Sequence, residues 1–365
     1  MQRVLRKLNC LLNQECSLKL GLVNMPDVVM KQILGELDFR TILLLRNVSH
    51  DFRSFIDTKP AGPRVTMIFI LVQSHAITFE IYTKSRFSRG PTQRVPIEYR
   101  KEDIGCMVTC TYRRANIQKF LKFEDFVNIA LKDLKVFINR QKCHLAVFQL
   151  DFDNTQRKFF GKIGNIKEIT ERFLISTEEM LKSRKQPLEV EDLCMSVTAQ
   201  EQVLKVLPYF DSKYIRKITI HGNNHPNTMD PLEFDKLEKL DQWKNAIDMN
   251  IWRYDIKTTP LESFLQFSRV DLFLFEVNAE KLIKLKNAIS LSSKVETFSI
   301  KYKILDGEDL LVKSLGQHSS STDRYGITES LWTFNFSNSS DMLSVSFLSS
   351  GTISFRRVKP SDIKS

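Results

Sequence analysis

The sequence predicts an α/β protein in which a short all-helical segment precedes a strand–helix domain that ends in a β meander. Three observations carry this prediction. Apolar residues recur every three or four positions in residues 22–57, which is the period of a helix. From about residue 188, strand-like and helix-like apolar runs follow one another. The last apolar runs alternate strictly, as half-buried strands do.

The bulk composition is that of a folded protein with more than one domain. Hydrophobic residues make up 42% of the chain and charged residues 27%, which is ordinary for globular proteins. A length of 365 residues exceeds what one core usually holds, and we expect domains at 1–21, 22–59 and 64–365. The longest dense apolar run, Val65 to Val72, is far shorter than the roughly 20 residues of a membrane helix. We therefore expect no membrane partner.

Residues 1–21 combine basic and apolar side chains. Arg3, Arg6 and Lys7 precede the first acid, Glu15, and leucines lie among and after them. This pattern predicts an amphipathic helix that leads into the first domain. A mitochondrial presequence stays open as an alternative.

Six cysteines lie scattered between Cys10 and Cys194, which in a chain of this length favours free thiols over a disulfide framework. We expect a reducing compartment, the cytoplasm and/or the nucleus. The closest pairs, Cys10/Cys16 and Cys106/Cys110, are not followed by His or Cys at zinc-finger spacing. We therefore expect no metal and no cofactor.

The chain is basic, with a formal net charge of +11. Part of the excess lies in residues 84–122, where ten Lys and Arg face three acids. Such a stretch attracts acidic partners, so a nucleic-acid-binding regulator is one alternative function. The stretch contains no zinc finger, RNP-type aromatic motif or dense Lys/Arg block, and we expect a solvated face and no nucleic-acid partner.

The first domain is predicted to contain three short helices. The first helix begins at Met25-Pro26-Asp27, where Pro suits the first turn and Asp suits the helix dipole. A second apolar run starts at Ile42, and a third ends at Ile56. Pro60, Gly62 and Pro63 end the module and predict a linker.

A β-hairpin is predicted for residues 64–82, because their apolar residues alternate on either side of a polar turn. A helix at about 122–139 and a strand at 145–150 follow.

The region 188–304 is predicted to repeat a strand–helix unit. Strands are expected at 190–197, 215–220, 249–254, 270–277 and 297–304, and helices at 199–210, 232–246, 260–267 and 279–291. Strand starts about 21 to 33 residues apart are typical of a leucine-rich-repeat-like solenoid, whose units stack to bury their apolar faces. The asparagine ladder of that repeat is missing, so an ordinary α/β sandwich and an α+β arrangement stay open. Residues 331–358 then predict three antiparallel strands.

The apolar pattern of residues 25–57 resembles the F-box. Its Leu-Pro-like pair is here Met25-Pro26, its Ile-Leu pair is Ile33-Leu34, and its closing run is Leu45-Arg46-Asn47-Val48-Ser49-His50-Asp51-Phe52-Arg53. Met25 for Leu and Phe52 for Trp depart from the pattern but keep apolar side chains. The resemblance implies binding to a Skp-type adaptor and, through it, to a cullin.

So short a segment cannot bury all of its apolar side chains, and we expect Pro26, Ile33, Leu34 and Leu37 on an exposed apolar face. The residues expected to contact the adaptor are Met25, Pro26, Val29, Ile33, Leu34, Leu37, Leu45, Val48 and Phe52. A helical subdomain that packs on the rest of the chain is the alternative without the resemblance.

Residues of about 90–305 resemble the FTH domain, which follows the F-box in a large nematode family. Three segments carry this resemblance, namely 237–246, 264–267 and 279–286. It implies that the domain selects the protein to be ubiquitinated, whose identity stays unknown. A ligase-independent interaction scaffold is a further alternative.

The strand-lined surface of 188–304 is the expected substrate site. Alternation places Leu272, Leu274 and Glu276 on one face, and Phe273, Phe275 and Val277 on the other. The charged residues expected to contribute to substrate selection are Lys217, Arg253, Arg269 and Lys301.

No catalytic residue is expected. Ser49-His50-Asp51 are consecutive on a helix, so their side chains diverge and cannot form a relay. His221 and His225 are interpreted as turn residues of a loop, and Gly161-x-x-Gly164 lacks the remainder of a phosphate-binding motif. The sequence therefore predicts a non-catalytic subunit of a ubiquitin ligase.

Overall fold

A computed structural model describes residues 25–37, 41–42, 45, 49–58, 64–84, 92–112, 115–141, 144–152, 166–222, 232–254, 256, 259–336 and 340–362. The chain divides into two compact units, one formed by residues 1–64 and 83–93, and the other by 65–82 and 94–365. The predicted N-terminal helix within 1–21, the linker at 60–63 and Val48 lie outside the described residues.

The first unit contains two described helices, α2 (Asp27–Glu36) and α4 (His50–Thr58). Helix α2 starts as predicted, with Pro26 at the cap position and Asp27 in the first turn. Helix α4 is capped by Ser49, whose hydroxyl accepts a hydrogen bond from the Phe52 amide at 3.2 Å. A small core holds the unit together. Its buried members are Met30, Leu34, Ile42, Phe52 and Ile56.

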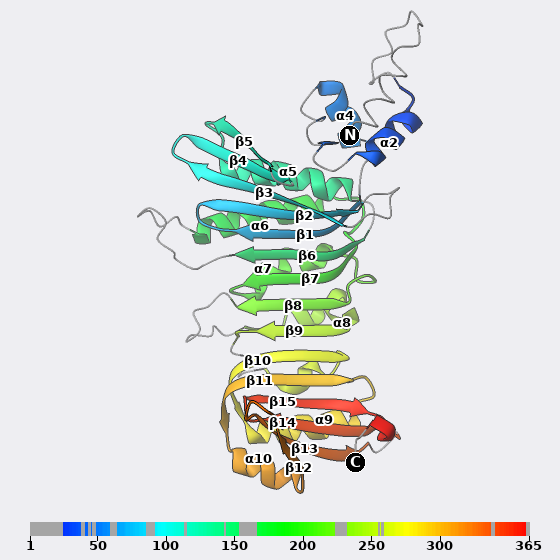
Figure 1. The fold of residues 1–365 in the computed structure, drawn as a ribbon, viewed down its shortest axis with the longest axis vertical. Helices are drawn as coiled ribbons and strands as arrows, with labels where there is room; N and C mark the ends of the chain where they lie inside the picture. Colours follow the sequence, from blue (N-terminus) through cyan, green and yellow to red (C-terminus); the bar gives the residue numbers. More distant parts are fainter. Residues whose placement is uncertain are drawn as a thin grey trace, which may run out of the picture. The chain divides into compact units, whose positions relative to one another are not determined.

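The described strands of the second unit form one mixed sheet of 15 strands (Figure 1). The first six are β1 (Arg64–Val72), β2 (Ala76–Lys84), β3 (Gln93–Glu102), β4 (Gly105–Tyr112), β5 (Ala115–Lys122) and β6 (Leu145–Phe152). The next five are β7 (Val190–Val197), β8 (Lys217–Gly222), β9 (Asp248–Trp252), β10 (Arg269–Asn278) and β11 (Thr297–Asp306). The last four are β12 (Ser319–Thr322), β13 (Thr328–Asn335), β14 (Met342–Leu348) and β15 (Thr352–Val358).

The centre of the sheet is parallel and follows the chain. Strands β6 to β11 lie side by side in sequence order, and β1 adds to β6, also in parallel. The sequence predicts that the strand–helix repeat begins at about residue 188. The parallel part of the sheet begins earlier in the chain, with β1 and β6. Antiparallel strands close both ends, with β3, β4 and β5 at one end and β12 to β15 at the other.

Strands β3 to β5 were not predicted. Val95, Ile97 and Tyr99 are buried at every second position of β3, but Pro96 stands between the first two, and a proline within such a run argues against a strand. The described part of the basic stretch 84–122 thus forms mainly the last three strands at one end of the sheet. The predicted meander is confirmed by β13, β14 and β15, to which β12 adds a fourth strand, and β15 pairs with β11.

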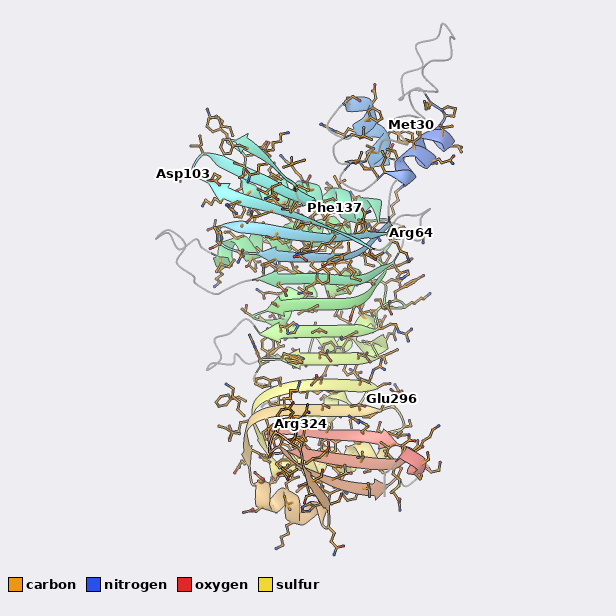
Figure 2. The ribbon with its side chains drawn as sticks, viewed as in Figure 1. Met30, Arg64, Asp103, Phe137, Glu296 and Arg324 are labelled. Atoms are coloured by element: carbon orange, nitrogen blue, oxygen red, sulfur yellow. The ribbon has the colours of Figure 1, made fainter. Side chains whose placement is uncertain are left out.

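The helices between strands lie behind the sheet in Figure 1. They are α5 (Phe126–Arg140), α6 (Ile166–Lys182), α7 (Gln200–Leu204), η2 (Leu207–Tyr209), η3 (Leu237–Lys239), α8 (Asp241–Asn245), η4 (Leu261–Phe264) and α9 (Ala279–Leu291). Outside this series lie α10 (Glu308–Leu315) and η5 (Pro360–Asp362). Phe137 of α5, labelled in Figure 2, belongs to this layer. Its ring packs on that of Phe79 of β2, with ring centroids 6.1 Å apart.

Three predicted helices are shorter than the sequence suggested, whereas α9 matches its prediction. Residues 199–210 form α7 and η2, residues 232–246 contain η3 and α8, and residues 260–267 contain η4. Neighbouring strands lie about 4.8 Å apart, whereas an α-helix is about 10 Å wide, so a full helix per strand would crowd the layer. Short helical and 3₁₀ turns fill the same space. Helices α6 and α10 were not predicted.

Strands β7 to β11 share one burial pattern, in which the first, fourth and sixth positions of a hexad are buried. The buried positions are Val190, Leu193 and Met195; Ile215, Ile218 and Ile220; Ala246, Met249 and Ile251; Phe267, Val270 and Leu272; and Val295, Phe298 and Ile300. The residues at the second position of each hexad are also joined from strand to strand by backbone hydrogen bonds. The Arg216 amide donates to Glu191 O at 2.9 Å, and the Ile247 amide donates to Arg216 O at 2.7 Å.

Candidate partner-binding surfaces

The residues predicted to contact an adaptor divide between a core and a surface. Leu34 is 1% exposed and Phe52 is 8% exposed, and both belong to the core of the helical unit. Met25, Leu37 and Leu45 pack against this core, and Ile33 is half-buried. The expectation of an exposed Leu34 is therefore wrong. Without its few large apolar side chains inside, a module of this size would have no core of its own.

The start of α2 carries the exposed apolar residues of the predicted segment. Pro26 is exposed, Val28 is 74% exposed and Val29 is 41% exposed. We call these three residues the α2 surface. Val28 is not among the residues that the sequence predicts to contact the adaptor. Its position could have indicated this, because it is an apolar residue that lies off the Ile33/Leu34/Leu37 stripe of the helix.

In the second unit, one side of β7 to β11 packs under the helices. The other side, which we call the open face, carries mostly half-buried and exposed residues, with Ser196 and Thr219 buried. The registers align Asp192, Lys217, Asp248, Arg269 and Thr297 across its first row. They align Ser196, His221, Trp252, Phe273 and Lys301 across its last row. Lys217, Arg269 and Lys301 thus share one face, as predicted.

The first row is a series of ion pairs between neighbouring strands. Arg269 donates from Nε and Nη2 to the carboxylate of Asp248 at 2.7 and 2.9 Å, which raises the pKa of Arg269. Lys217 Nζ lies 3.9 Å from Asp192 Oδ2. Burial raises the pKa of Asp192 to about 6, although Lys217 opposes the shift. The charges of this row largely compensate one another.

The last row, together with the next outward positions of β10 and β11, combines lysines with aromatic rings. Lys301 Nζ lies 4.7 Å from the ring centroid of Trp252, and Lys303 Nζ lies 5.5 Å from that of Phe275. Phe273 lies between Trp252 and Lys301 in the register. We call Trp252, Phe273, Phe275, Lys301 and Lys303 the aromatic–lysine strip.

Comparison with protein families separates the same two regions. Residues 22–62 match the F-box domain, and residues 171–312 match the FTH domain. The chain is an F-box/FTH protein. No curated protein and no solved structure gave a match.

The FTH match begins within α6 and ends within α10, so residues 90–170 of the expected resemblance lie outside it. The F-box suggests an adaptor role in SCF-type ubiquitin ligases and implies binding of a Skp1-type adaptor. F-box proteins are generally substrate adaptors rather than catalysts, and neither match indicates a catalytic family. Within the described residues, no helix has the length and apolar character needed to cross a membrane.

Arg253 of this F-box/FTH protein lies just beyond β9, because that strand ends at Trp252 and not at Tyr254 as predicted. Its backbone is left-handed, with φ 67°, and its side chain is exposed. The strand ends early because Tyr254 is drawn inward. Tyr254 is fully buried, and its hydroxyl donates to the carbonyl oxygens of Val197 and His221. The chain turns at Arg253 so that Tyr254 can reach under the sheet.

His221 was interpreted as a loop residue, and the structure corrects this. It belongs to β8, and its ring lies 6.3 Å from that of Trp252. Burial lowers its pKa, which favours the neutral imidazole, although the carboxylate of Asp151 opposes the shift. Its expected neighbour His225 lies outside the described residues, and the part of the chain that is described contains no cluster of metal-ligating groups.

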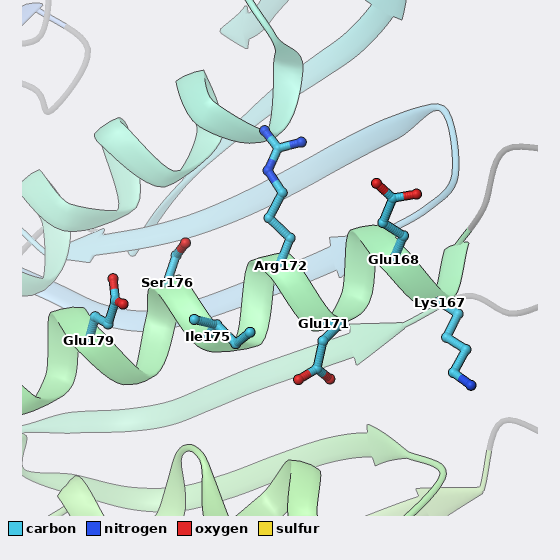
Figure 3. Close-up of a pocket in the computed structure, with 7 residues that line it drawn as sticks. All are labelled: Lys167, Glu168, Glu171, Arg172, Ile175, Ser176 and Glu179. Carbon is cyan, nitrogen blue, oxygen red and sulfur yellow. The ribbon is translucent and has the colours of Figure 1, made fainter.

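A surface hollow lies along α6, lined by Lys167, Glu168, Glu171, Arg172, Ile175, Ser176 and Glu179 (Figure 3). Figure 3 shows Arg172 and Glu171 pointing to opposite sides of the helix. Arg172 donates to Asp125 and to Asn128 of α5, and Glu171 accepts from Lys205 at 2.6 Å. These side chains join α6 to its neighbours, and no predicted site residue lines the hollow.

Proposed function

We propose that this F-box/FTH protein is a substrate-recognition adaptor of a Skp–cullin–F-box ubiquitin ligase. The F-box match, together with the exposed apolar α2 surface, carries the proposal. Pro26, Val28 and Val29 would bury their exposed area against the adaptor, at about 25 cal/mol per Å² of apolar surface. The adaptor would join the protein to a cullin, and the ligase's other subunits would supply the chemistry.

The remaining members of the predicted adaptor set act differently in this proposal. Leu34 and Phe52 shape the α2 surface from the core, and Met25, Leu37 and Leu45 pack beside them. Ile33 is half-buried and would contact the adaptor at the rim. Val48 lies outside the described residues, and we include it among the adaptor contacts on the sequence pattern alone.

We also propose that the FTH domain is a leucine-rich-repeat-like solenoid. The buried hexad has the Leu-x-x-Leu-x-Leu spacing of that repeat. Its first positions are 190, 215, 246, 267 and 295, so successive hexads start 25, 31, 21 and 28 residues apart. In this arrangement the open face binds the protein to be ubiquitinated. We place the action in the cytoplasm, the nucleus or both, where free thiols such as Cys106 and Cys194 persist.

The adaptor role is tested by changing the α2 surface without touching the core. Val28→Asp with Val29→Asp places carboxylates on the surface that would meet the adaptor, where an unpaired buried charge costs several kcal/mol. Asp in the first turn of a helix is favourable to the dipole, so the unit should stay folded. Gln32→Asp, at an exposed position of the same helix, is the matched control.

Co-purification of a Skp1-type adaptor and a cullin with each variant is the measurement. We expect loss of both proteins for the double variant and retention for Gln32→Asp. Retention of both proteins by the folded double variant would rule out binding through the α2 surface. Retention of the adaptor without the cullin in the unchanged protein would favour a ligase-independent scaffold.

A further inference from the structure

Strand β5 forms one edge of the sheet, where it pairs with β4 and with no other described strand (Figure 1). The opposite edge is β12, which consists of exposed Ser and Thr residues. Strand β5 differs from it, because it carries apolar and basic side chains together. Ile117 is 38% exposed and Phe120 is 42% exposed, and Lys119 and Lys122 are exposed as well. An open edge with such side chains is a surface to which another strand can be added.

The backbone contacts at the end of β5 determine which of its amides point to the open edge. The Phe123 amide donates to Ile104 O at 2.8 Å, and Leu121 O points so closely at Gly105 of β4 that a Cβ atom there would clash. Hydrogen-bonded and non-hydrogen-bonded pairs alternate along an antiparallel ladder. The amides of every second residue of β5 therefore point away from β4. These residues are Gln118, Phe120 and Lys122.

The side chains of β5 offer the same combination on both faces of the sheet. On one face Lys119 lies between Ile117 and Leu121, because side chains alternate along a strand. On the other face Lys122 lies beside Phe120. A strand added to this edge would thus meet an ammonium group next to apolar surface on each of its faces.

The charge of the edge favours an acidic partner. Strand β5 contains two lysines and no acid. Glu124 and Asp125, which follow it, pair with basic residues of α5 and α6. The acids at 102–103 lie at the turn between β3 and β4 and do not flank the open edge. A second copy of β5 would set lysines against lysines, which is unfavourable, whereas an acidic strand would set carboxylates against them.

The residue that follows β5 adds an exposed aromatic ring. Phe123 is 81% exposed and has a φ of 62°, which is uncommon for a bulky residue. Lys122 Nζ lies 4.8 Å from the centroid of its ring. Ile104, whose carbonyl accepts from the Phe123 amide, is 56% exposed. The edge therefore ends in an apolar pair on which the end of a bound segment can pack.

We propose that β5 binds an acidic peptide segment of a partner protein as an added antiparallel strand. The surface lies outside the F-box match and the FTH match, so the inference goes beyond the proposed function. Read from its first residue, the segment has the order acid, apolar, apolar, acid, polar, apolar. These side chains lie opposite Lys122, Leu121, Phe120, Lys119, Gln118 and Ile117, in that order.

Fluorescence anisotropy of the full chain with a labelled peptide, Glu-Val-Val-Glu-Thr-Val-Thr, tests this. We expect saturable binding that weakens as salt rises, since the charged contacts are exposed. The same peptide with Lys in place of both Glu should not bind. A single-stranded oligonucleotide of equal charge should not displace the peptide, because it has no amides to complete a strand. Displacement at equal concentration would assign the edge to nucleic acid and overturn the proposal.

Lys119→Glu with Lys122→Glu should weaken binding of the peptide at least about tenfold, because opposite charges become like charges. Arg356→Glu with Lys359→Glu is the matched control, since it makes the same change of net charge at exposed positions of β15 and just beyond it. This control should change the affinity less than about twofold. Equal binding by the unchanged protein and the folded β5 variant would refute the charge contacts.

Gln118→Pro tests the backbone contacts, because it removes an amide that points to the open edge and leaves the ladder with β4 intact. It should abolish binding, whereas Gln118→Ala, which keeps the amide, should retain it. N-methylated peptides make the same test without changing the protein, should Gln118→Pro lower the melting temperature. Methyl groups on the amides opposite Gln118 and Phe120 should abolish binding, and methyl groups on those opposite Lys119 and Leu121 should not. Equal binding of the two methylated peptides would rule out strand addition.

Discussion

Arg269 on β10 and Asp248 on β9 form a two-point ion pair across neighbouring strands, although 21 residues separate them in the sequence. Both guanidinium contacts are at hydrogen-bond distance, at 2.7 and 2.9 Å. The pair explains why a conspicuous arginine on the open face is not free for a partner. The two side chains can meet because the register of β9 and β10 places Arg269 directly beside Asp248.

Arg269→Gln should lower the free energy of unfolding only modestly, by up to about 1 kcal/mol, because exposed ion pairs contribute little. Chemical denaturation at low and high salt checks this, and the loss should shrink at high salt. An equal loss of stability at low and high salt would show that the pair does not act through its charges.

Asp192→Asn should change the dependence of stability on pH. The pKa of Asp192 rises from 3.8 to about 6 in the folded chain, chiefly because of burial, so the fold favours the protonated acid. Its contribution to stability is therefore complete below about pH 4 and is lost as the pH rises through about 6. The amide cannot ionise and avoids this loss.

The stability of Asp192→Asn relative to the unchanged protein should accordingly improve between about pH 4 and pH 7. The gain should be on the order of 1–2 kcal/mol, after allowance for solvent screening of a carboxyl that is 31% exposed. Urea unfolding of both proteins across this range measures it. A constant difference at every pH would show that the carboxyl titrates alike in the folded and unfolded chains.

Leu34→Ala should destabilise the helical unit by about 2–5 kcal/mol, because Leu34 is 1% exposed and its removal leaves a cavity. Adaptor binding should be lost together with helical structure, as measured by circular dichroism of the full chain and by co-purification. This separates Leu34 from Val28 and Val29, whose replacement should leave the helices intact. Leu34→Met, which nearly conserves volume, should retain adaptor binding.

Gln242→Ala should loosen the contact between successive strand–helix units. The buried amide of Gln242 on α8 donates to Pro208 O at 3.1 Å and to Phe210 O at 2.7 Å. The substitution leaves two carbonyl oxygens without this donor, at a cost of about 1–3 kcal/mol. Hydrogen exchange of the 207–246 segment should accelerate. Asn245→Ala, which removes an exposed bond to Ser212 O, is the milder control.

A chain of residues 64–365 should fold without residues 1–60. Most of it belongs to one compact unit, although residues 83–93 group with the N-terminal unit. A cooperative thermal transition and a monodisperse elution profile are the expected outcome. An aggregated product would instead indicate that the helical segment completes the core of the larger unit.

Local sequence was sufficient for several parts of this protein. The alternation of apolar residues predicts β7 to β11, and the helical period and its Asn278 cap define α9. The F-box pattern is visible because its apolar positions are set within about thirty residues of chain. These features depend on residues that are close together in the sequence, so they can be predicted from the sequence alone.

Other features were decided only when distant segments came together. Whether Leu34 is buried depends on Ile42, Phe52 and Ile56 closing over it, and the pairing of Arg269 depends on which strand lies beside β10. The alternation predicted for β10 also inverts at its end, where Glu276 is exposed and Val277 is buried close to the start of α9. The burial and the ion pairing of a side chain depend on every residue that lies near it in space, however far apart the two are in the sequence. The sequence places charged residues on a strand, and the tertiary structure determines which of them are already paired and which can meet a partner.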